Sequence, residues 1–257
     1  MIKIAIANQK GGVGKTTTAL NIADALIHCN YKVLFLDLDP QCNSTSSYNA
    51  KIEKTTTIYD VINGECLPSD AIQHTDFGDI IAGDRLLTEC EGKLLTNIGG
   101  HNVIKKALHQ IEETCDYDFV IMDTPPNLGI YMLNALTAAN GCIIPLKAEK
   151  YAVDGLKLLI ETINDVIENT NAKLRIYGVL LTAYDKRTSL DKAIWKTLPN
   201  VGKVYGFNVF KTPVRICQTI KDAQAEGISL FKKDSSSNGS LDYAHIVKEL
   251  LENLEED

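Results

Sequence analysis

The feature that most constrains the fold is a glycine-rich segment near the start of the chain, NQKGGVGKTTTA, residues 8–19. It follows a short apolar run at residues 2–7 that is typical of a buried strand, and it precedes a helical pattern over residues 16–29. Its glycines lack a Cβ atom, so the backbone can adopt unusual dihedral angles and direct several N–H groups at one anion. A strand, a glycine-rich loop and a helix in this order predict a phosphate-binding loop.

The loop departs from the common phosphate-loop pattern, G-x-x-x-x-G-K-[ST], at two positions. Gln9 stands where that pattern has its first glycine, and Lys10 adds a second cation inside the loop. The end of the pattern, Gly14-Lys15-Thr16, is intact. There the Lys15 side chain can pair with nucleotide phosphates and the Thr16 hydroxyl can ligate Mg²⁺. The alternative, a strand-to-helix turn without a ligand, is the weaker interpretation of this sequence in this context.

Two other apolar runs end in acidic residues. The run VLFLDLD ends with Asp37 and Asp39, and the run DFVIMD ends with Asp123. Carboxylates beside a phosphate loop can hold magnesium directly or through water, and a second carboxylate can orient an attacking water. Either strand-end aspartate alone would more often be a helix cap or a turn residue. Physical reasoning alone does not rank Asp37 against Asp39 for the water-orienting role.

Apolar runs alternate with helical patterns along the chain, and several runs are apolar throughout, as in strands covered on both faces. This alternation predicts an α/β fold with a doubly wound, mostly parallel sheet, helices on both faces and one domain spanning residues 1–257. Two segments rich in Ser, Thr, Asn and Lys are predicted as loops, residues 41–57 and 232–240. The expected strands are residues 2–7, 33–37, 79–82, 119–123, 142–145 and 176–182. The expected helices include residues 16–29, 102–115, 152–168 and 241–252.

Composition narrows the class of protein. Seven cysteines without a Cys-x-x-Cys pair argue against a disulfide framework or a zinc site, and are most simply small buried residues. No apolar stretch reaches the roughly 18 residues of a membrane span. The net charge is −7, yet residues 173–233 carry 12 basic and 4 acidic side chains, against 14 and 29 in the remainder. This basic segment indicates either a solvated face or a surface for a polyanion.

The segments KGGVGKTT, LDLDPQ, DTPP and PLKAEKYAVDGL together resemble the deviant-Walker P-loop ATPases of the ParA/MinD superfamily. The resemblance is strongest to the ParA (Soj-like) branch, which separates plasmids and chromosomes. It runs in register from Ile2 to about Ile160 and is weaker afterwards. The resemblance implies a P-loop NTPase-like fold, ATP and Mg²⁺ as cofactors, ATP hydrolysis, and a homodimer in the ATP-bound state.

The resemblance also assigns roles to residues. Lys10 is expected to reach across the dimer to the partner's phosphates, and Asp39 to position the hydrolytic water, so Lys10, Lys15 and Asp39 are the expected catalytic residues. Residues 149–159 are expected to contribute to the dimer interface, and also to be an ordinary amphipathic helix. The metal region is expected to comprise Thr16, Asp37 and Asp123. The expected nucleotide contacts are Lys10, Gly11, Gly12, Val13, Gly14, Lys15, Thr16 and Thr17.

DNA and membranes are the competing targets in this superfamily. A ParA-like protein binds non-specific DNA through basic residues of its C-terminal part. In this chain the resemblance assigns that role to Arg187, Arg215 and Lys221 of segment 173–233. The resemblance to the ParA branch also implies a ParB-like partner that stimulates hydrolysis, and a cytoplasmic, nucleoid-associated location. The alternative is a MinD-like or other cargo-positioning ATPase acting at a membrane or protein complex. The acidic C-terminal run ELLENLEED argues against an anionic membrane surface.

Overall fold

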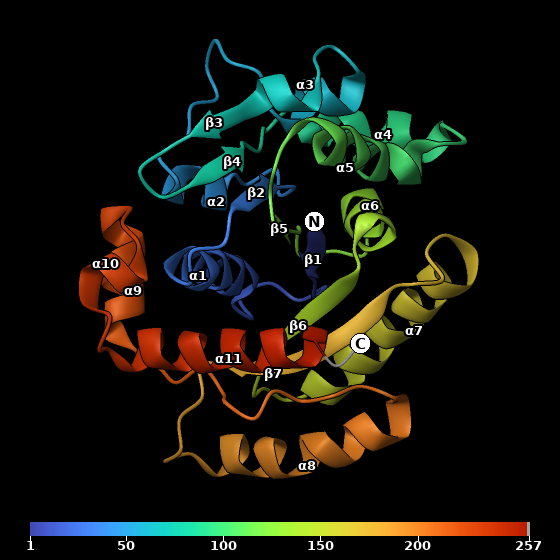
Figure 1. Cartoon of the computed structure of the whole chain (residues 1–257). Helices are drawn as coiled ribbons and strands as arrows, with labels where there is room; N and C mark the ends of the chain where they lie inside the picture. Colours follow the sequence, from blue (N-terminus) through green and yellow to red (C-terminus); the bar gives the residue numbers. More distant parts are fainter. Residues whose placement is uncertain (256–257) are drawn as a thin grey trace.

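A single twisted sheet forms the centre of the protein (Figure 1). The computed structural model describes residues 1–255, and their strands are β1 (Ile2–Ile6), β2 (Val33–Asp37), β3 (Ile72–His74), β4 (Asp79–Ile81), β5 (Phe119–Asp123), β6 (Gly141–Lys147) and β7 (Arg175–Thr182). Their order across the sheet is β3-β4-β2-β5-β1-β6-β7. All neighbouring pairs are parallel except β3 with β4 at one edge. The doubly wound, mostly parallel α/β fold predicted from the sequence is confirmed.

Helices cover both faces of this sheet (Figure 1). The α-helices are α1 (Lys15–His28), α2 (Asn43–Ser47), α3 (Ile58–Asn63), α4 (Leu87–Thr96), α5 (Val103–Thr114), α6 (Ile130–Ala138), α7 (Ala152–Asn169), α8 (Ser189–Tyr205), α9 (Gln218–Glu226), α10 (Leu230–Asp234) and α11 (Asn238–Glu255). Two 3₁₀ turns, η1 (Pro68–Ala71) and η2 (Gly100–Asn102), precede β3 and α5.

The central strand β1 shows how the sheet divides the core into two layers. Ile4 and Ile6 point into a cluster that includes the apolar faces of α1 and α11, whereas Ala5 and Ala7 point into a cluster with α5, α6 and α7. Successive side chains of a strand alternate between the two faces, so a strand buried on both faces must be apolar at every position. The apolar runs of β2 and β5 before their terminal aspartates follow from this requirement, as do the buried residues 4–6 of β1.

Most expected elements occur where the sequence placed them. The predicted strands are all present, with ends shifted by no more than two residues. Helix α1 ends at His28, and Asn30 adopts the left-handed conformation with φ 66°, as expected of an asparagine just past a helix end. The short antiparallel strand β3 was not predicted, because its three residues carry no apolar pattern.

Two predicted loops are partly wrong. Segment 41–57 contains α2, and segment 232–240 contains the end of α10 and the start of α11. Polar side chains in both segments are buried and paired: Ser44 donates to the buried Asp123, and Ser240 donates to the carbonyl of Asp234. Polar composition indicates a loop when a segment is solvated, and these serines are instead buried. The interpretation of the cysteines as buried residues holds for Cys42, Cys90 and Cys142, whereas Cys29 is exposed and the other three are only partly buried.

The strand order places one group of segments at a single edge. The carboxyl ends of β2, β5, β1 and β6 are neighbours, and the chain leaves β1 directly into the glycine-rich loop. The order in which strands are added to the sheet reverses at β1, since β2 and β5 lie on one side of it and β6 and β7 on the other. Ligands of open α/β sheets bind at such a switch point, so the topology brings the loop and the strand-end aspartates to one place.

Close packing at the start of β6 provides a stability test. A Cβ atom at Gly141 would lie 2.4 Å from Cζ of Tyr177. We expect Gly141→Ala to lower the free energy of unfolding by about 1–3 kcal/mol, because the ring must shift within a packed core. Urea denaturation of the two proteins measures the difference. Gly92→Ala is the matched control: its Cβ would meet no atom within 4 Å in helix α4, so it should be neutral or stabilising.

Candidate functional site

The glycine-rich loop has the backbone geometry of an anion cradle. Gly12 and Gly14 have φ angles of 73° and 85°, values that side chains with a Cβ rarely adopt. Gly14 is also the residue that precedes the first turn of α1, so the unpaired N–H groups of that helix begin at the loop. Helix N-termini favour anions through these N–H groups and the helix dipole. The loop and helix therefore offer a phosphate site at the carboxyl end of β1.

Two buried side chains hold the loop in shape. The Asn8 side chain donates to the carbonyl of Pro145 at 2.7 Å and accepts from the backbone N–H of Lys10 at 3.0 Å. On the other side, the Thr182 hydroxyl contacts the carbonyl of Val13 at 2.7 Å. The loop is thus fixed between β6 and the end of β7 before any ligand arrives, which reduces the entropy lost on binding.

Lys15 turns inward under the loop. Its side-chain nitrogen donates to the carbonyl of Lys10 at 3.0 Å, and the residue is buried. Burial lowers the pKa of its ammonium group, and the carboxylates of Asp123 and Asp39 oppose that shift. A cation already desolvated and placed under a cradle of N–H groups is the arrangement that binds nucleotide phosphates.

Asp37 and Asp123 are brought together by strand register. They are aligned residues at the carboxyl ends of β2 and β5, and both are completely buried. Burial raises the pKa of each carboxyl, with smaller contributions from the neighbouring acid; hydrogen bonds from Thr45 to Asp37 and from Ser44 to Asp123 oppose the rise. Two acids in one desolvated place favour a bound cation or a bound proton.

The donor set fits magnesium. Oδ2 of Asp123 accepts from the Ser44 hydroxyl at 2.8 Å, but its buried Oδ1 has no hydrogen-bond partner. Thr16 lies close enough for its side chain to lower the pKa of Asp123. Among residues 1–255 no group of three or more His, Cys, Asp or Glu side chains could hold a metal ion alone. Mg²⁺ suits such a site, because it usually takes few protein oxygens and completes its octahedron with water and phosphate.

Asp39 lies beside this pair but is oriented differently. Its Oδ1 accepts from the backbone N–H of Gln41 at 2.9 Å, and its own N–H donates to Oδ1 of Asp37 at 3.1 Å. The residue is 6% exposed, whereas Asp37 and Asp123 are 0% exposed. Asp39 is therefore the carboxylate of the three that lies nearest to solvent, a position suited to a water molecule.

Lys10 lies on the outer side of the loop, against the start of α7. Its side-chain nitrogen donates to the carbonyl of Tyr151 at 3.0 Å, and Gln9 donates to the carbonyl of Gly155 at 3.1 Å. Tyr151 has a left-handed backbone with φ 67° and is largely exposed. Helix α7 buries Leu156, Leu159 and Ile160, so its expected amphipathic character is confirmed.

A hollow of about 430 Å³ opens next to the loop. Gly14 and Thr17 line one side, and Thr182, Ile216 and Tyr243 belong to the other parts of its wall. Its volume lies in the range of small-molecule sites, and its lining combines apolar side chains with a few polar groups. No local sequence pattern predicts this hollow, because its walls come from segments far apart in the chain.

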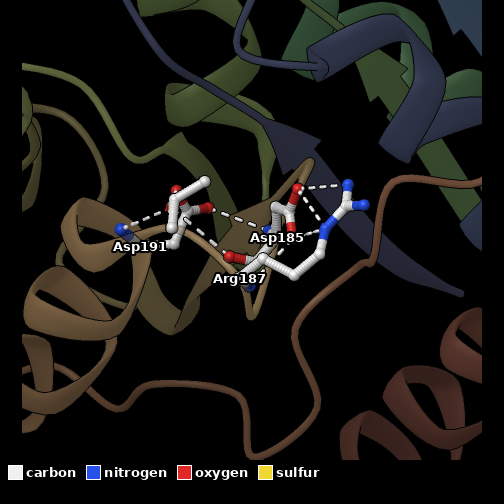
Figure 2. Close-up of polar contacts among 4 residues, drawn as sticks. Asp185, Arg187 and Asp191 are labelled. Atoms are coloured by element: carbon white, nitrogen blue, oxygen red, sulfur yellow. Dashed lines mark hydrogen bonds and ion pairs between the residues drawn. The ribbon is translucent and has the colours of Figure 1, made fainter.

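The residues expected to contact DNA lie near each other but are not equally available. Arg187 and Arg215 line one hollow, and Lys221 with Arg215 lines the adjoining one beside the loop. The Arg187 guanidinium donates to both oxygens of Asp185, whose pKa this pairing lowers to about 2 (Figure 2). The Arg187 side chain is still 84% exposed. Arg215 is held more firmly, because it pairs with the buried carboxylate of Asp242 at 2.6 Å.

The basic segment 173–233 does not form one continuous face. Lys173 lines a different hollow, at the amino-terminal ends of β1 and β6, together with Lys3 and Lys105. Lys233 pairs with Glu226, and Lys232 donates to the carbonyl of Asp76. The surplus of charge counted along the sequence is therefore distributed over separate surfaces.

Sequence reasoning missed four polar residues that support the site. Ser44 and Thr45 bind the buried aspartates, Thr182 holds the loop, and Gln224 donates to the Thr17 hydroxyl at 3.0 Å. The only signal was the run of serine and threonine directly after the acidic strand end, which could have been interpreted as ligands of those acids. The other two lie too far from the loop in the sequence for any local pattern to reveal them.

The structure and this site define a protein of the P-loop NTPase fold. The comparisons with known proteins agree and go further. A family model described as an AAA domain matches residues 1–176. The chromosome partitioning protein ParA of Caulobacter vibrioides is 36% identical over 96% of this chain and 93% of its own length. The sporulation initiation inhibitor protein Soj of Bacillus subtilis is 35% identical over 97% of this chain and 98% of its own length. The chain therefore belongs to the ParA and Soj family of partitioning proteins.

A solved structure supports the same placement. The crystal structure of cobyrinic acid a,c-diamide synthase from Mycobacterium smegmatis with bound ATP analog and magnesium has a TM-score of 0.83 and 33% sequence identity. The match covers 99% of this chain and 96% of that chain. In residues 1–255 no helix is both long and apolar enough to cross a membrane.

Replacement of one buried acid tests the electrostatics of the site. Because the folded state binds a proton at Asp123 more tightly than the unfolded state does, this carboxyl contributes stability that is fully present below pH about 4 and is lost as pH rises through the raised folded pKa. We therefore expect Asp123→Asn to stabilise the metal-free protein by about 1–2 kcal/mol at pH 8 and by less at pH 5.

Thermal unfolding in EDTA at the two pH values measures this difference. The Asn side chain keeps an oxygen for the Ser44 hydroxyl, so packing is preserved. An Asp123→Asn protein that is less stable than the original at pH 8 would contradict the electrostatic interpretation.

Proposed function

We propose that this chain is an ATP-dependent DNA-partitioning ATPase that hydrolyses ATP with Mg²⁺. The observation that carries the proposal is the position of Lys15 between the glycine loop and the buried Asp123, which is aligned with Asp37, in a chain of the ParA and Soj family. That arrangement supports one chemistry well: binding and hydrolysis of a nucleoside triphosphate.

In this proposal each residue has a stated task. The N–H groups from Gly11 to Thr17 and the Lys15 ammonium hold the phosphates. Thr16, Asp37 and Asp123 hold Mg²⁺, which when bound supplies positive charge that stabilises the transferring phosphoryl group. Asp39 orients the attacking water, since it is the acid nearest to solvent. Val13 contributes its backbone, which the Thr182 hydroxyl fixes.

The ATP-bound form in this proposal is a homodimer. Lys10 lies on the outer side of the loop, and its ammonium group donates to the backbone carbonyl of Tyr151, a contact that it can exchange for a phosphate of the partner subunit. The neighbouring surface carries exposed apolar side chains, Tyr151 and Leu158, that a second copy could cover. A cation supplied across the dimer stabilises charge that develops during hydrolysis.

The proposed polyanion is non-specific DNA. Arg187 and Lys221 are exposed, and they lie with Arg215 on adjoining hollows. Contacts with the DNA backbone need positioned cations and carry no sequence code. A ParB-like partner that stimulates hydrolysis, and a cytoplasmic, nucleoid-associated location, complete the proposal.

The membrane alternative is weakened by the last helix. Helix α11 turns its apolar residues Tyr243, Ile246 and Leu250 into the core beside α1, so that face is not available to a bilayer. Its acidic end also argues against an anionic surface; Glu256 and Asp257 of that run lie outside the described residues.

Asp39→Ala tests the hydrolytic assignment. We expect ATP turnover to fall about a hundredfold or more, because the water loses its orienting group, while ATP binding persists. The variant should accumulate as an ATP-bound dimer that retains arbitrary duplex DNA. Phosphate release measures ATP turnover, light scattering in ATP measures the dimer, and retention on DNA measures DNA binding. Turnover equal to that of the unmodified protein would rule out this role for Asp39.

Lys10→Ala tests the second lysine. We expect the dimer to be lost in ATP, whereas binding of nucleotide by the single chain changes little, because Lys15 remains in place. Sedimentation velocity with and without ATP distinguishes the two properties. Lys105→Ala is a suitable control, since it removes an exposed lysine at the opposite end of the sheet from the loop. An ATP-dependent dimer of Lys10→Ala would contradict the proposed contact.

Arg187→Ala and Lys221→Ala test the DNA surface. Each should weaken binding to all DNA sequences alike and reduce the slope of log affinity against log salt by about 1, as expected when one phosphate contact is lost. Lys173→Ala is the control on the opposite end of the sheet. Affinities measured by fluorescence anisotropy over a salt series provide the slopes. Unchanged slopes in both variants, or an equal change in the control, would exclude this surface.

A further inference from the structure

One side-chain hydrogen bond joins helix α9 to the phosphate loop. The amide nitrogen of Gln224 donates to the hydroxyl oxygen of Thr17 at 3.0 Å, across 207 residues of sequence. Both residues line the hollow beside the loop, and the contact is partly buried. Thr17 lies in the first turn of α1, directly after the two residues that end the phosphate-loop pattern.

The direction of this bond decides what Thr17 can do. A primary amide nitrogen only donates, and a hydroxyl has one proton and two acceptor sites. When Gln224 occupies an acceptor site of Thr17, the single hydroxyl proton stays free for another acceptor. A helical threonine often gives that proton to the carbonyl four residues earlier, here Val13. That carbonyl already accepts from the Thr182 hydroxyl at 2.7 Å. One lone pair of that carbonyl stays free, but a phosphate oxygen bound in the loop carries negative charge and is the stronger acceptor for this proton.

The position of Gln224 is itself fixed by contacts with α1. Helix α9 ends at Glu226, and its C-cap Gly227 has a φ of 63°. Two residues further on, the Ser229 hydroxyl lies 2.6 Å from the buried carboxylate of Asp24. The backbone N–H of Phe231 donates to the same carboxylate at 3.2 Å. Asp24 lies two helical turns beyond Thr17, on the same face of α1. The helix that carries Thr17 therefore also anchors the segment that carries Gln224.

The other end of this contact is the surface assigned to DNA. Lys221 lies three residues before Gln224, hence on the same face of α9, and it lines the same hollow as Thr17. A change in the Thr17 contact would therefore act on the helix that presents Lys221.

We infer that Gln224 is a positioning residue of the nucleotide site: by donating to Thr17 it directs the threonine proton to a bound phosphate, and it links phosphate occupancy to helix α9. This inference rests on the proposed function, since it requires nucleotide in the loop and DNA at Lys221. Thermodynamic linkage requires the effect to be reciprocal, so DNA must strengthen nucleotide binding through the same contact.

The test is a double-mutant cycle in the full chain, with ATP and ADP affinities measured by isothermal titration calorimetry in Mg²⁺. Gln224→Ala and Thr17→Val should each weaken nucleotide binding about fivefold, the usual effect of one hydrogen bond. The double variant Thr17→Val/Gln224→Ala should be no weaker than Thr17→Val, since Gln224 acts through the hydroxyl. Gln224→Glu should weaken binding more than Gln224→Ala, because a carboxylate only accepts and draws the threonine proton away from phosphate.

Gln218→Ala is the matched control for Gln224→Ala, because it makes the same change on the exposed part of α9, where Gln218 donates to Asp222. It should leave nucleotide affinity unchanged. Thermal unfolding without nucleotide identifies any variant that is weak only because it is less stable. Strictly additive losses in the cycle, or equal affinities for Gln224→Glu and the unmodified protein, would overturn the inference.

The link to α9 is measured as the ratio of ATP affinities with and without saturating short duplex DNA. We expect DNA to tighten ATP binding about fivefold in the unmodified protein, a typical coupling between two sites. The ratio of ATP affinities with and without DNA should be at least threefold smaller in Gln224→Ala, because most of that coupling is lost. An unchanged ratio would overturn the link. If the unmodified chain binds no ATP, the proposed function fails instead, so the two failures are distinguishable.

Discussion

The structure depends on two carboxylates that are buried where water cannot solvate them. Strand register aligns Asp37 with Asp123 at the centre of the sheet, and burial raises the pKa of both. Isolated charges in such a place are costly, so they must be paired, protonated or metal-bound. Ser44 and Thr45 satisfy some of their oxygens, Lys15 supplies nearby charge, and one oxygen of Asp123 is left without a partner. The fold thereby builds a site whose electrostatics are completed by a cation and an anion together.

Sequence alone could predict the parts of this arrangement that depend on local pattern. Strand β1, the glycine loop and helix α1 follow one another without interruption, so their order fixes their geometry. The acids at the ends of β2 and β5 are predictable because each strand is apolar up to its terminal aspartate, and parallel strands bring their carboxyl ends to one edge. What the pattern cannot supply is which pair of strands becomes adjacent. That depends on the packing of helices on both faces.

The parts that sequence could not predict involve contacts across the whole chain. Thr182 lies in β7 and holds a loop that follows β1, and Gln224 contacts a residue 207 positions earlier. In the sequence, the residues next to Thr182 and Gln224 do not distinguish them from an ordinary threonine or glutamine on the surface. The short helix α2 was hidden for a related reason: its polar residues satisfy buried acids rather than solvent. Polar composition predicts exposure only when no buried partner exists.

The C-terminal third of the chain carries basic residues and also packs against the helix that begins in the phosphate loop. Its helices α10 and α11 pack on α1, the helix that begins in the phosphate loop, and Ser229 reaches the buried Asp24 of that helix. In the proposed function, helix α1 consequently holds phosphate at one end and contacts the C-terminal segment along its side. Packed cores have discrete arrangements, so a helix anchored in this way is expected to transmit a small displacement rather than absorb it. The proposed nucleotide and DNA sites can then be coupled through this one helix.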